Sequence, residues 1–170
     1  MQYQLQICNN LHDDHMATIR LLERLEEMLS RRGPKSPPDP EDAEFRALLA
    51  DLSAAMKNEI TNHFGFEEEH LFSRIQALGD TPMLTILMDE HDTIRPLALQ
   101  VTEAEENARE AGFTAEDWAT FHDLGFELIE RETFHIQKEE MGFLPLLDQI
   151  VSPEEDEPLS KSYLESKTTD

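Results

Sequence analysis

Two stretches of the sequence carry the same set of side chains that could bind a metal ion. Each has a histidine, a pair of glutamates that begins four positions later, and then bulky apolar residues; one copy begins at His63 and the other at His135. On an α-helix, four steps turn the chain by about 400°, so a histidine and the glutamate four residues later lie within about 40° of each other. His63 with Glu67, and His135 with Glu139, are therefore predicted to form two bidentate metal-binding pairs.

Four amphipathic segments must position these pairs. Apolar residues recur at intervals of three and four along each segment, which is the helical period, and no strand pattern interrupts them. The predicted helices span about residues 9–30, 41–78, 81–111 and 114–145. Prolines and glycines separate them, with Thr81 before Pro82 and Thr114 placed as N-caps. The pattern predicts an all-α protein, folded as an antiparallel up-down four-helix bundle.

Every predicted helix places a histidine on its apolar side. These four residues are His15, His63, His91 and His135. A buried imidazole or carboxylate without a partner is costly, so the group must be satisfied collectively, by hydrogen bonds or by a cation. Imidazoles together with carboxylates suit iron, manganese or zinc. The coincidence on four helices favours a metal site.

Three other polar positions are predicted to lie away from the metal. His122 is about 140° around its helix from His135 and is expected to face a flank of the bundle or solvent. Glu68 and Glu140 point about 100° beyond the inward glutamates, so they are expected beside the ligands or on the surface.

The composition limits the classes of partner and compartment. A formal net charge of -23 repels phosphate backbones and anionic lipid, so neither nucleic acid nor a membrane is expected as a partner. Apolar runs are too short to span a bilayer, and the N-terminus lacks the pattern of a secretory signal. A single cysteine, Cys8, excludes an internal disulfide and is expected to be a packing residue. We expect a cytoplasmic protein.

The domain organisation is expected to be simple. Residues 1–151 are long enough for one bundle with its own core, whereas residues 152–170 turn to proline, serine and acidic residues. This composition predicts a disordered acidic tail.

The site residues together resemble the hemerythrin-like, or HHE cation-binding, family. The resemblance is carried by Asp14-His15, His63-Phe64, Glu67-Glu68, Leu71-Phe72, Glu90-His91, His135, Glu139-Glu140 and Leu144-Pro145. It covers about residues 9–150 and implies a four-helix bundle that holds two non-haem irons with an oxo or hydroxo bridge. Carried over residue by residue, it implies His15, His63, His91 and His135 as terminal ligands, with Glu67 and Glu139 as bridging carboxylates.

One position departs from the oxygen-carrying members of that family. Their third helix offers two histidines spaced by four, whereas the residue four after His91 is Arg95, which cannot ligate. His12, one turn before His15, and His70, about 20° from the direction of His63 on an α-helix, are the candidate substitutes. A missing ligand would make one iron more labile or more open to exogenous ligands.

The sequence leaves several functions open. We expect a protein that binds or senses oxygen, nitric oxide, peroxide or iron status, with a small diatomic ligand as partner. An enzyme or iron-delivery factor, repairing iron-sulfur clusters or reducing nitric oxide or peroxide, is the alternative, and a helical interaction domain with a self-satisfied polar core is a third. A ferritin-like di-iron site also fits by spacing, through Glu67-x-x-His70 and Glu132-x-x-His135.

Overall fold

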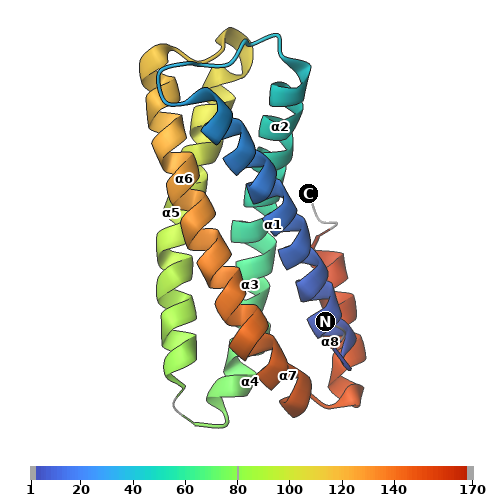
Figure 1. The fold of residues 1–170 in the computed structure, drawn as a ribbon. Helices are drawn as coiled ribbons and strands as arrows, with labels where there is room; N and C mark the ends of the chain where they lie inside the picture. Colours follow the sequence, from blue (N-terminus) through green and yellow to red (C-terminus); the bar gives the residue numbers. More distant parts are fainter. Residues whose placement is uncertain (1–2, 80, 168–170) are drawn as a thin grey trace.

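Helices make up almost all of the computed structural model, which describes residues 3–79 and 81–167 and contains no strand within them (Figure 1). The predicted all-α class is confirmed for that part of the chain. The helices are α1 (Gln6–Arg32), α2 (Ala43–Asn58), α3 (Phe64–Phe66), α4 (Phe72–Gln76), α5 (Pro82–Ala111), α6 (Ala115–Lys138), α7 (Leu144–Ile150) and α8 (Pro153–Ser166). Within the described residues, every helix is too short or too polar to cross a bilayer.

Three π-helical segments connect some of these helices into longer rods. They are η1 (Glu59–His63) and η2 (Glu67–Leu71), between α2 and α4, and η3 (Glu139–Phe143), between α6 and α7. A π-helical turn holds one residue more than an α-helical turn, so it shifts the direction of every later side chain, and such turns are frequent at functional sites. All three segments carry residues predicted to bind the metal.

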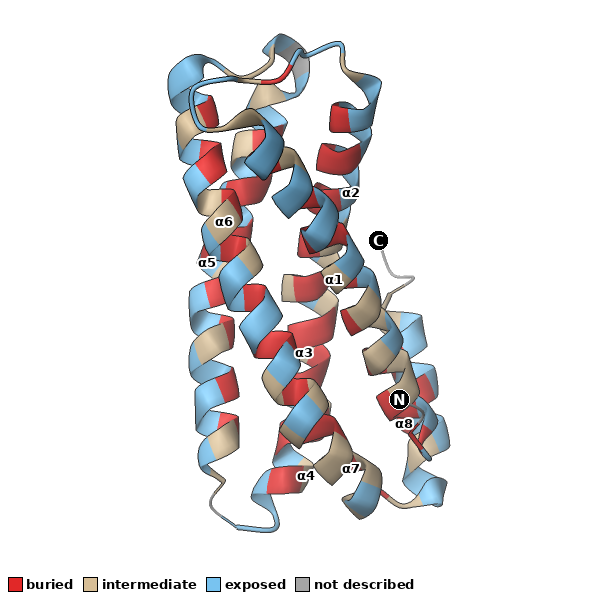
Figure 2. Ribbon diagram, in the orientation of Figure 1, coloured by how far each residue is buried: buried red, intermediate tan, exposed pale blue. Residues whose placement is uncertain are grey.

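The long helices enclose a common interior. α1 packs against α2 and α6, and α5 packs against the same two helices. Buried residues line the inner side of each helix (Figure 2). They form two apolar clusters, one around Leu11, Phe72 and Phe143 and the other around Leu25 and Trp118. On α1 and α5, the predicted ligands His15 and His91 lie between these two clusters.

The N-terminus of α1 begins earlier than predicted. The apolar pattern predicts a start near residue 9, but the helix begins at Gln6. The backbone N–H groups of Gln6 and Ile7 donate to the carboxylate of Asp156 at 2.7 and 2.9 Å. Asp156 therefore caps α1 from the far end of the chain, which no local pattern around Asn9 could indicate.

The predicted disorder of residues 152–170 is wrong for α8, which lies beside the start of α1 (Figure 1). Ser152 and Glu155 form a capping box, and Pro153 occupies the first helical position. The acidic residues that suggested disorder stand in the first turn, where they favour the helix dipole. Leu159 and Tyr163 are buried against the rest of the fold. Residues 168–170 lie outside the described part of the chain.

Thr81 and Thr114 stand at the N-cap positions of α5 and α6 as predicted, but the side chain of Thr81 makes no cap hydrogen bond. Thr114 caps α6, since its side chain accepts from the backbone N–H of Asp117. The loop between α1 and α2 begins at Gly33, where φ is 67°, and the carbonyl of Gly33 accepts a hydrogen bond of 2.8 Å from the indole of Trp118. This contact ties the loop to α6.

Candidate metal centre

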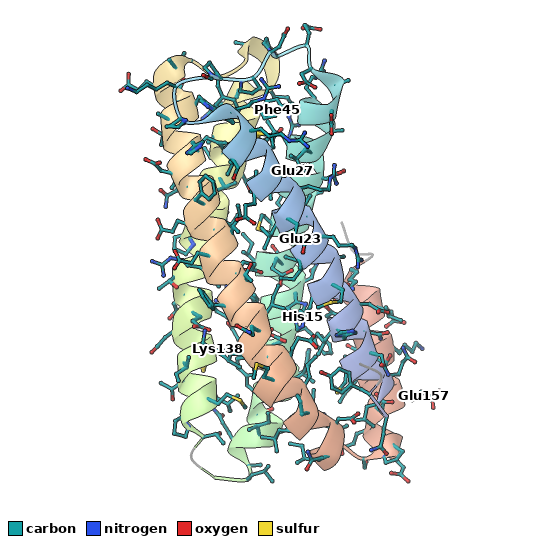
Figure 3. The ribbon with its side chains drawn as sticks, in the orientation of Figure 1. His15, Glu23, Glu27, Phe45, Lys138 and Glu157 are labelled. Atoms are coloured by element: carbon teal, nitrogen blue, oxygen red, sulfur yellow. The ribbon has the colours of Figure 1, made fainter. Side chains whose placement is uncertain are left out.

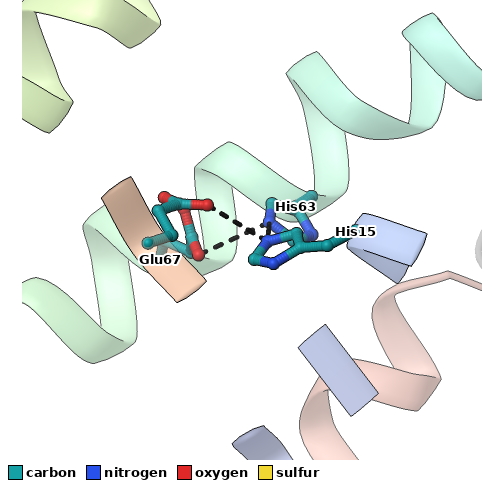
Figure 4. Close-up of side chains that lie close together, drawn as sticks. His15, His63 and Glu67 are labelled. Atoms are coloured by element: carbon teal, nitrogen blue, oxygen red, sulfur yellow. Dashed lines mark hydrogen bonds and ion pairs between the residues drawn. The ribbon is translucent and has the colours of Figure 1, made fainter. Parts of the chain in front are cut away.

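Four side chains from three helical rods converge on the inner side of α1. His15 comes from α1, His63 from η1, Glu67 from η2 and Glu139 from η3, and one ligand atom of each lies within 4.8 Å of the others. The Nε2 atoms of His15 and His63 are 3.2 Å apart, and His63 Nε2 is 3.4 Å from Glu67 Oε1. Figure 4 shows these three side chains turned towards one another.

A second group of four shares both carboxylates with the first. It consists of His91 from α5, His135 from α6, and again Glu67 and Glu139. The Nε2 atoms of His91 and His135 are 3.1 Å apart. His91 Nε2 lies 3.5 Å from Glu67 Oε2, and His135 Nε2 lies 3.2 Å from Glu139 Oε1.

The two carboxylates are arranged as bridges between the two groups. Glu67 directs Oε1 towards His63 and Oε2 towards His91. Glu139 directs Oε2 towards His15, at 3.1 Å, and Oε1 towards His135. Each group therefore has two imidazole nitrogens and one oxygen from each glutamate.

The six side chains are buried, and the oxygens of the two glutamates have no hydrogen-bond partner. His15 is 1% exposed and the other five are 0% exposed. None of the four oxygens of Glu67 and Glu139 has a hydrogen-bond partner. Buried carboxylates without hydrogen bonds are costly, so these oxygens need a positive charge beside them.

Outer carboxylates hold Nδ1 of three of the histidines, so that Nε2 faces the centre. Nδ1 of His15 lies 2.7 Å from Glu140, and Nδ1 of His91 lies 2.6 Å from Glu68. His135 Nδ1 lies 3.1 Å from Glu90. A carboxylate accepts only, so Nδ1 carries the hydrogen and Nε2 presents its lone pair to the centre. This pattern is typical of histidines that ligate metal ions.

The carboxylates are themselves held by cations at the edge of the fold. Glu68 accepts from Arg95 at 2.8 Å, and Glu90 accepts from Lys138 at 2.6 Å. Lys138 stands on α6 and His15 on α1 in Figure 3. Aromatic rings complete the surroundings of the second group, where the ring of Phe64 stacks on that of His91 with centroids 3.8 Å apart.

Protons supply part of the positive charge when no cation is bound. Burial lowers the pKa of His15, but the adjacent carboxylates of Glu139 and Glu140 outweigh this effect and raise the pKa to about 9. Burial likewise opposes the protonation of His63 and His135, yet nearby carboxylates raise both pKa values well above the usual one. The site therefore retains positive charge, and a metal ion would displace these protons as it binds.

All six residues predicted as ligands come together, but the two candidate substitutes do not join them. His12 Nδ1 lies 2.9 Å from Glu140, so His12 supports the partner of His15. The side chain of His70 is 41% exposed and lies 3.9 Å from Glu69. The expected direction of His70 assumed a continuous α-helix, whereas η1 and η2 shift the register between His63 and His70.

Neither His12 nor His70 supplies the ligand that was expected to be missing at Arg95. Arg95 does not approach the centre but holds Glu68 and lies over the ring of Phe64. Both groups have the same donors, namely two histidines and the two shared carboxylates. Four protein donors for each ion would leave positions for an exogenous ligand on both sides.

His122 is placed differently from its prediction, whereas Glu68 and Glu140 lie beside ligand histidines as expected. His122 is 9% exposed, among aromatic residues of the second apolar cluster. Its Nε2 lies 3.3 Å from the carbonyl of Leu29. The expectation that it faces a flank or solvent is wrong, because α1 covers it.

Two further buried carboxylates lie near the centre, namely Glu59, which was not predicted, and Glu132, which the sequence indicated only in the ferritin-like alternative. Glu59 is 2% exposed and its Oε1 lies 3.8 Å from His63 Nε2, while Glu132 is 0% exposed with both oxygens unpaired. Burial raises the pKa of Glu132 to about 8, and the charge of Glu59 adds to this effect. Both residues follow the buried spacing of their helices, between Met56 and His63 and between Leu128 and His135, so the sequence did contain a signal.

The donor set fits a pair of transition-metal cations. Imidazole nitrogens and carboxylate oxygens suit iron, manganese and zinc. Positive charge from such ions would compensate the oxygens of Glu67 and Glu139, which have no hydrogen-bond partner. The ferritin-like alternative is less favoured, since it requires His70, which points away from the centre.

Comparison with known proteins gives one family. A family described as "Hemerythrin HHE cation binding domain" matches residues 6–147. No curated protein matches the chain. The matched range contains all the residues of the two metal-binding groups and ends before α8.

Proposed function

Since the chain belongs to the hemerythrin HHE cation-binding domain family, we propose that it binds two iron ions and, through them, a small diatomic ligand such as oxygen or nitric oxide. The observation that carries this proposal is the sharing of Glu67 and Glu139 between two histidine pairs. The four oxygens of these glutamates are buried without a hydrogen-bond partner, so a cation bound between them would compensate their charge.

Each ion would have its own histidines. His15 and His63 would hold one ion, and His91 and His135 the other, with Glu67 and Glu139 contributing an oxygen to each. Iron supplies one-electron redox chemistry and exchangeable coordination positions. Manganese or zinc could occupy the same donors, and the amounts available in the cell would then decide between them.

The protein side chains hold the centre rigid and dry. The carboxylates behind His15, His91 and His135 fix the ring orientations. The two apolar clusters lie on either side along the bundle, so water has limited access to a bound ligand. We infer an antiparallel up-down arrangement of the four long rods, as expected for a hemerythrin-like bundle.

A sensing role is consistent with this design. A ligand or a change of redox state would alter the charge of a centre that all four long rods share, so the packing of the whole bundle would respond. We propose oxygen, nitric oxide, peroxide or iron status as the signal. Neither nucleic acid nor a membrane is proposed as a partner, because of the negative charge of the chain.

One observation favours a catalytic alternative. Reduction of nitric oxide or peroxide consumes protons, and Glu132 is a buried acid near His135 whose raised pKa keeps it protonated at neutral pH. An enzyme that reduces such ligands would use it as an internal proton donor. Iron delivery or repair of iron-sulfur clusters would need a route for iron or for a partner protein.

Visible absorption of the iron-loaded protein separates these functions. We expect air oxidation to produce a charge-transfer spectrum that changes reversibly when azide or nitric oxide is added. Continuous consumption of nitric oxide or peroxide with a reductant would support the catalytic alternative instead. A wild-type protein that takes up no stoichiometric metal would refute both.

A further inference from the structure

Three of the four inward histidines are held by a carboxylate, and His63 is not. Glu140, Glu68 and Glu90 face Nδ1 of His15, His91 and His135. The Nδ1 atom of His63 instead lies 2.9 Å from the phenol oxygen of Tyr163 on α8.

The contact of His63 with Tyr163 differs from the corresponding contact in the other half of the site. On α5, Glu90 precedes His91 and supports the histidine of the neighbouring rod, His135. On α1, Asp14 precedes His15 in the same way, but its carboxylate is 3.9 Å from His63 Nδ1. The hydroxyl of Tyr163 stands between the two groups and donates to Asp14.

The direction of these hydrogen bonds follows from the number of hydrogens. A phenol has one, and it goes to the carboxylate of Asp14, so the oxygen of Tyr163 accepts from the N–H of His63. Lys167 also donates to Asp14 and lies over the ring of Tyr163, 4.5 Å from its centroid. The acceptor that His63 meets is therefore a neutral oxygen.

α8 is held firmly enough to position this phenol. Tyr163 is 0% exposed, Asp156 caps α1, and the amide of Asn10 donates to Ser160 at 2.8 Å. The region matched by the family, residues 6–147, ends before this helix. α8 thus adds to this chain a contact that the matched region does not contain.

We propose that Tyr163 is a positioning residue for the His15–His63 half of the metal centre and makes this half weaker than the His91–His135 half. The inference rests on the proposed function, because it assumes that each half holds an ion. A carboxylate behind an imidazole increases its basicity more than a neutral phenol does. The two ions should therefore leave the protein in order, and the ion held by His15 and His63 should leave first.

Release of ferrous ions to a competing chelator, measured without oxygen, tests the proposal. Wild-type protein should lose its two ions in two steps. Tyr163→Phe removes the hydroxyl and leaves the N–H of His63 unpaired, so the weaker ion should lose affinity by about 10–100-fold while the tighter ion is unchanged. Ser160→Ala, which removes a different contact between α8 and α1, is the matched control and should change neither step.

A double variant assigns the step to one half. His15→Gln should remove the weaker ion, and adding Tyr163→Phe to it should then have no further effect on the ion that remains. If Tyr163→Phe does not fold, judged by circular dichroism, Asp14→Asn tests the same chain of hydrogen bonds and should weaken the same ion.

Each outcome decides the matter. Suppose that the wild-type protein holds two ions and that Tyr163→Phe either holds both as tightly as wild type or loses affinity for both by the same factor. Either result would overturn this inference and leave the proposed function standing. A wild-type protein that binds no ferrous ion would refute the proposed function as well.

Discussion

Replacing Glu132 by glutamine should stabilise the metal-free protein, and the gain should grow with pH. Glu132 is fully buried near the centre with both oxygens unpaired. Its pKa in the folded protein is about 8, compared with the usual value of 4.5. The carboxyl group is therefore protonated in the folded state at pH values where it is ionised in the unfolded chain.

The sign of the effect follows from proton binding. Between about pH 4.5 and pH 8, the folded protein binds the proton and the unfolded chain releases it, so the free energy of unfolding falls as the pH rises. A shift of this size corresponds to about 3 kcal/mol at pH 7 and about 5 kcal/mol well above pH 8. These values are ceilings, because water entering the site would reduce both.

Glutamine keeps the volume of the side chain but cannot ionise. The variant should therefore resemble wild type near pH 5 and exceed it by up to about 3 kcal/mol at pH 7. Urea unfolding of both proteins with a metal chelator, followed by circular dichroism from pH 5 to pH 8, measures the difference. Glu130→Gln, an exposed change two residues away, is the control and should stay within about 0.5 kcal/mol at every pH.

Equal stability at all pH values, or a variant that is less stable throughout, would refute this reasoning. Either result would mean that Glu132 is ionised and paired in solution. Bound cations should reduce the gain, since positive charge beside Glu132 favours its ionised form.

Three other predictions follow from the arrangement. His91→Gln removes a donor from one half of the centre, so elemental analysis should find one metal ion per chain; two ions would contradict the assignment. His70→Ala should keep both ions and change the free energy of unfolding by less than about 0.5 kcal/mol, because this side chain lies outside the two metal-binding groups. Loss of metal from this variant would show that His70 is a ligand after all. Gly112→Ala should cost about 1–3 kcal/mol in urea unfolding, because φ is +76° and a Cβ atom would lie 2.9 Å from that of Pro40; unchanged stability would show that the turn relaxes freely.

Much of the centre could be predicted because helical spacing determines which side chains point inwards. His15 and His91 stand at apolar positions of their helices, and the structure buries both. The same spacing also marks Glu132, between Leu128 and His135. Sequence reasoning placed it only in the ferritin-like alternative, because glutamate usually lies on the surface, although the period alone would place it inside.

Other features depend on interruptions of the regular helix. A π-helical turn cannot be recognised from apolar spacing, which assumes the α-helical period throughout. The direction predicted for His70 is therefore wrong.

The C-terminal helix shows a different limit. Ser152, Pro153 and Glu155 together are a helix-start signal, so α8 could have been predicted from its cap. Its contact with the centre could not, because Tyr163 and His63 are far apart in the chain and no spacing rule joins them. Only the packing of α8 on α1 brings the phenol to the imidazole.

The number of metal ions bound by each chain tests the central claim most directly. Protein purified without added chelator and reconstituted with ferrous ion should hold two ions per chain, and the double variant Glu67→Ala, Glu139→Ala should hold none. Glu69→Ala, an exposed change in the same segment as Glu67, should still hold two. A wild-type chain with one ion or none, or a double variant that keeps both, would contradict the shared carboxylate centre.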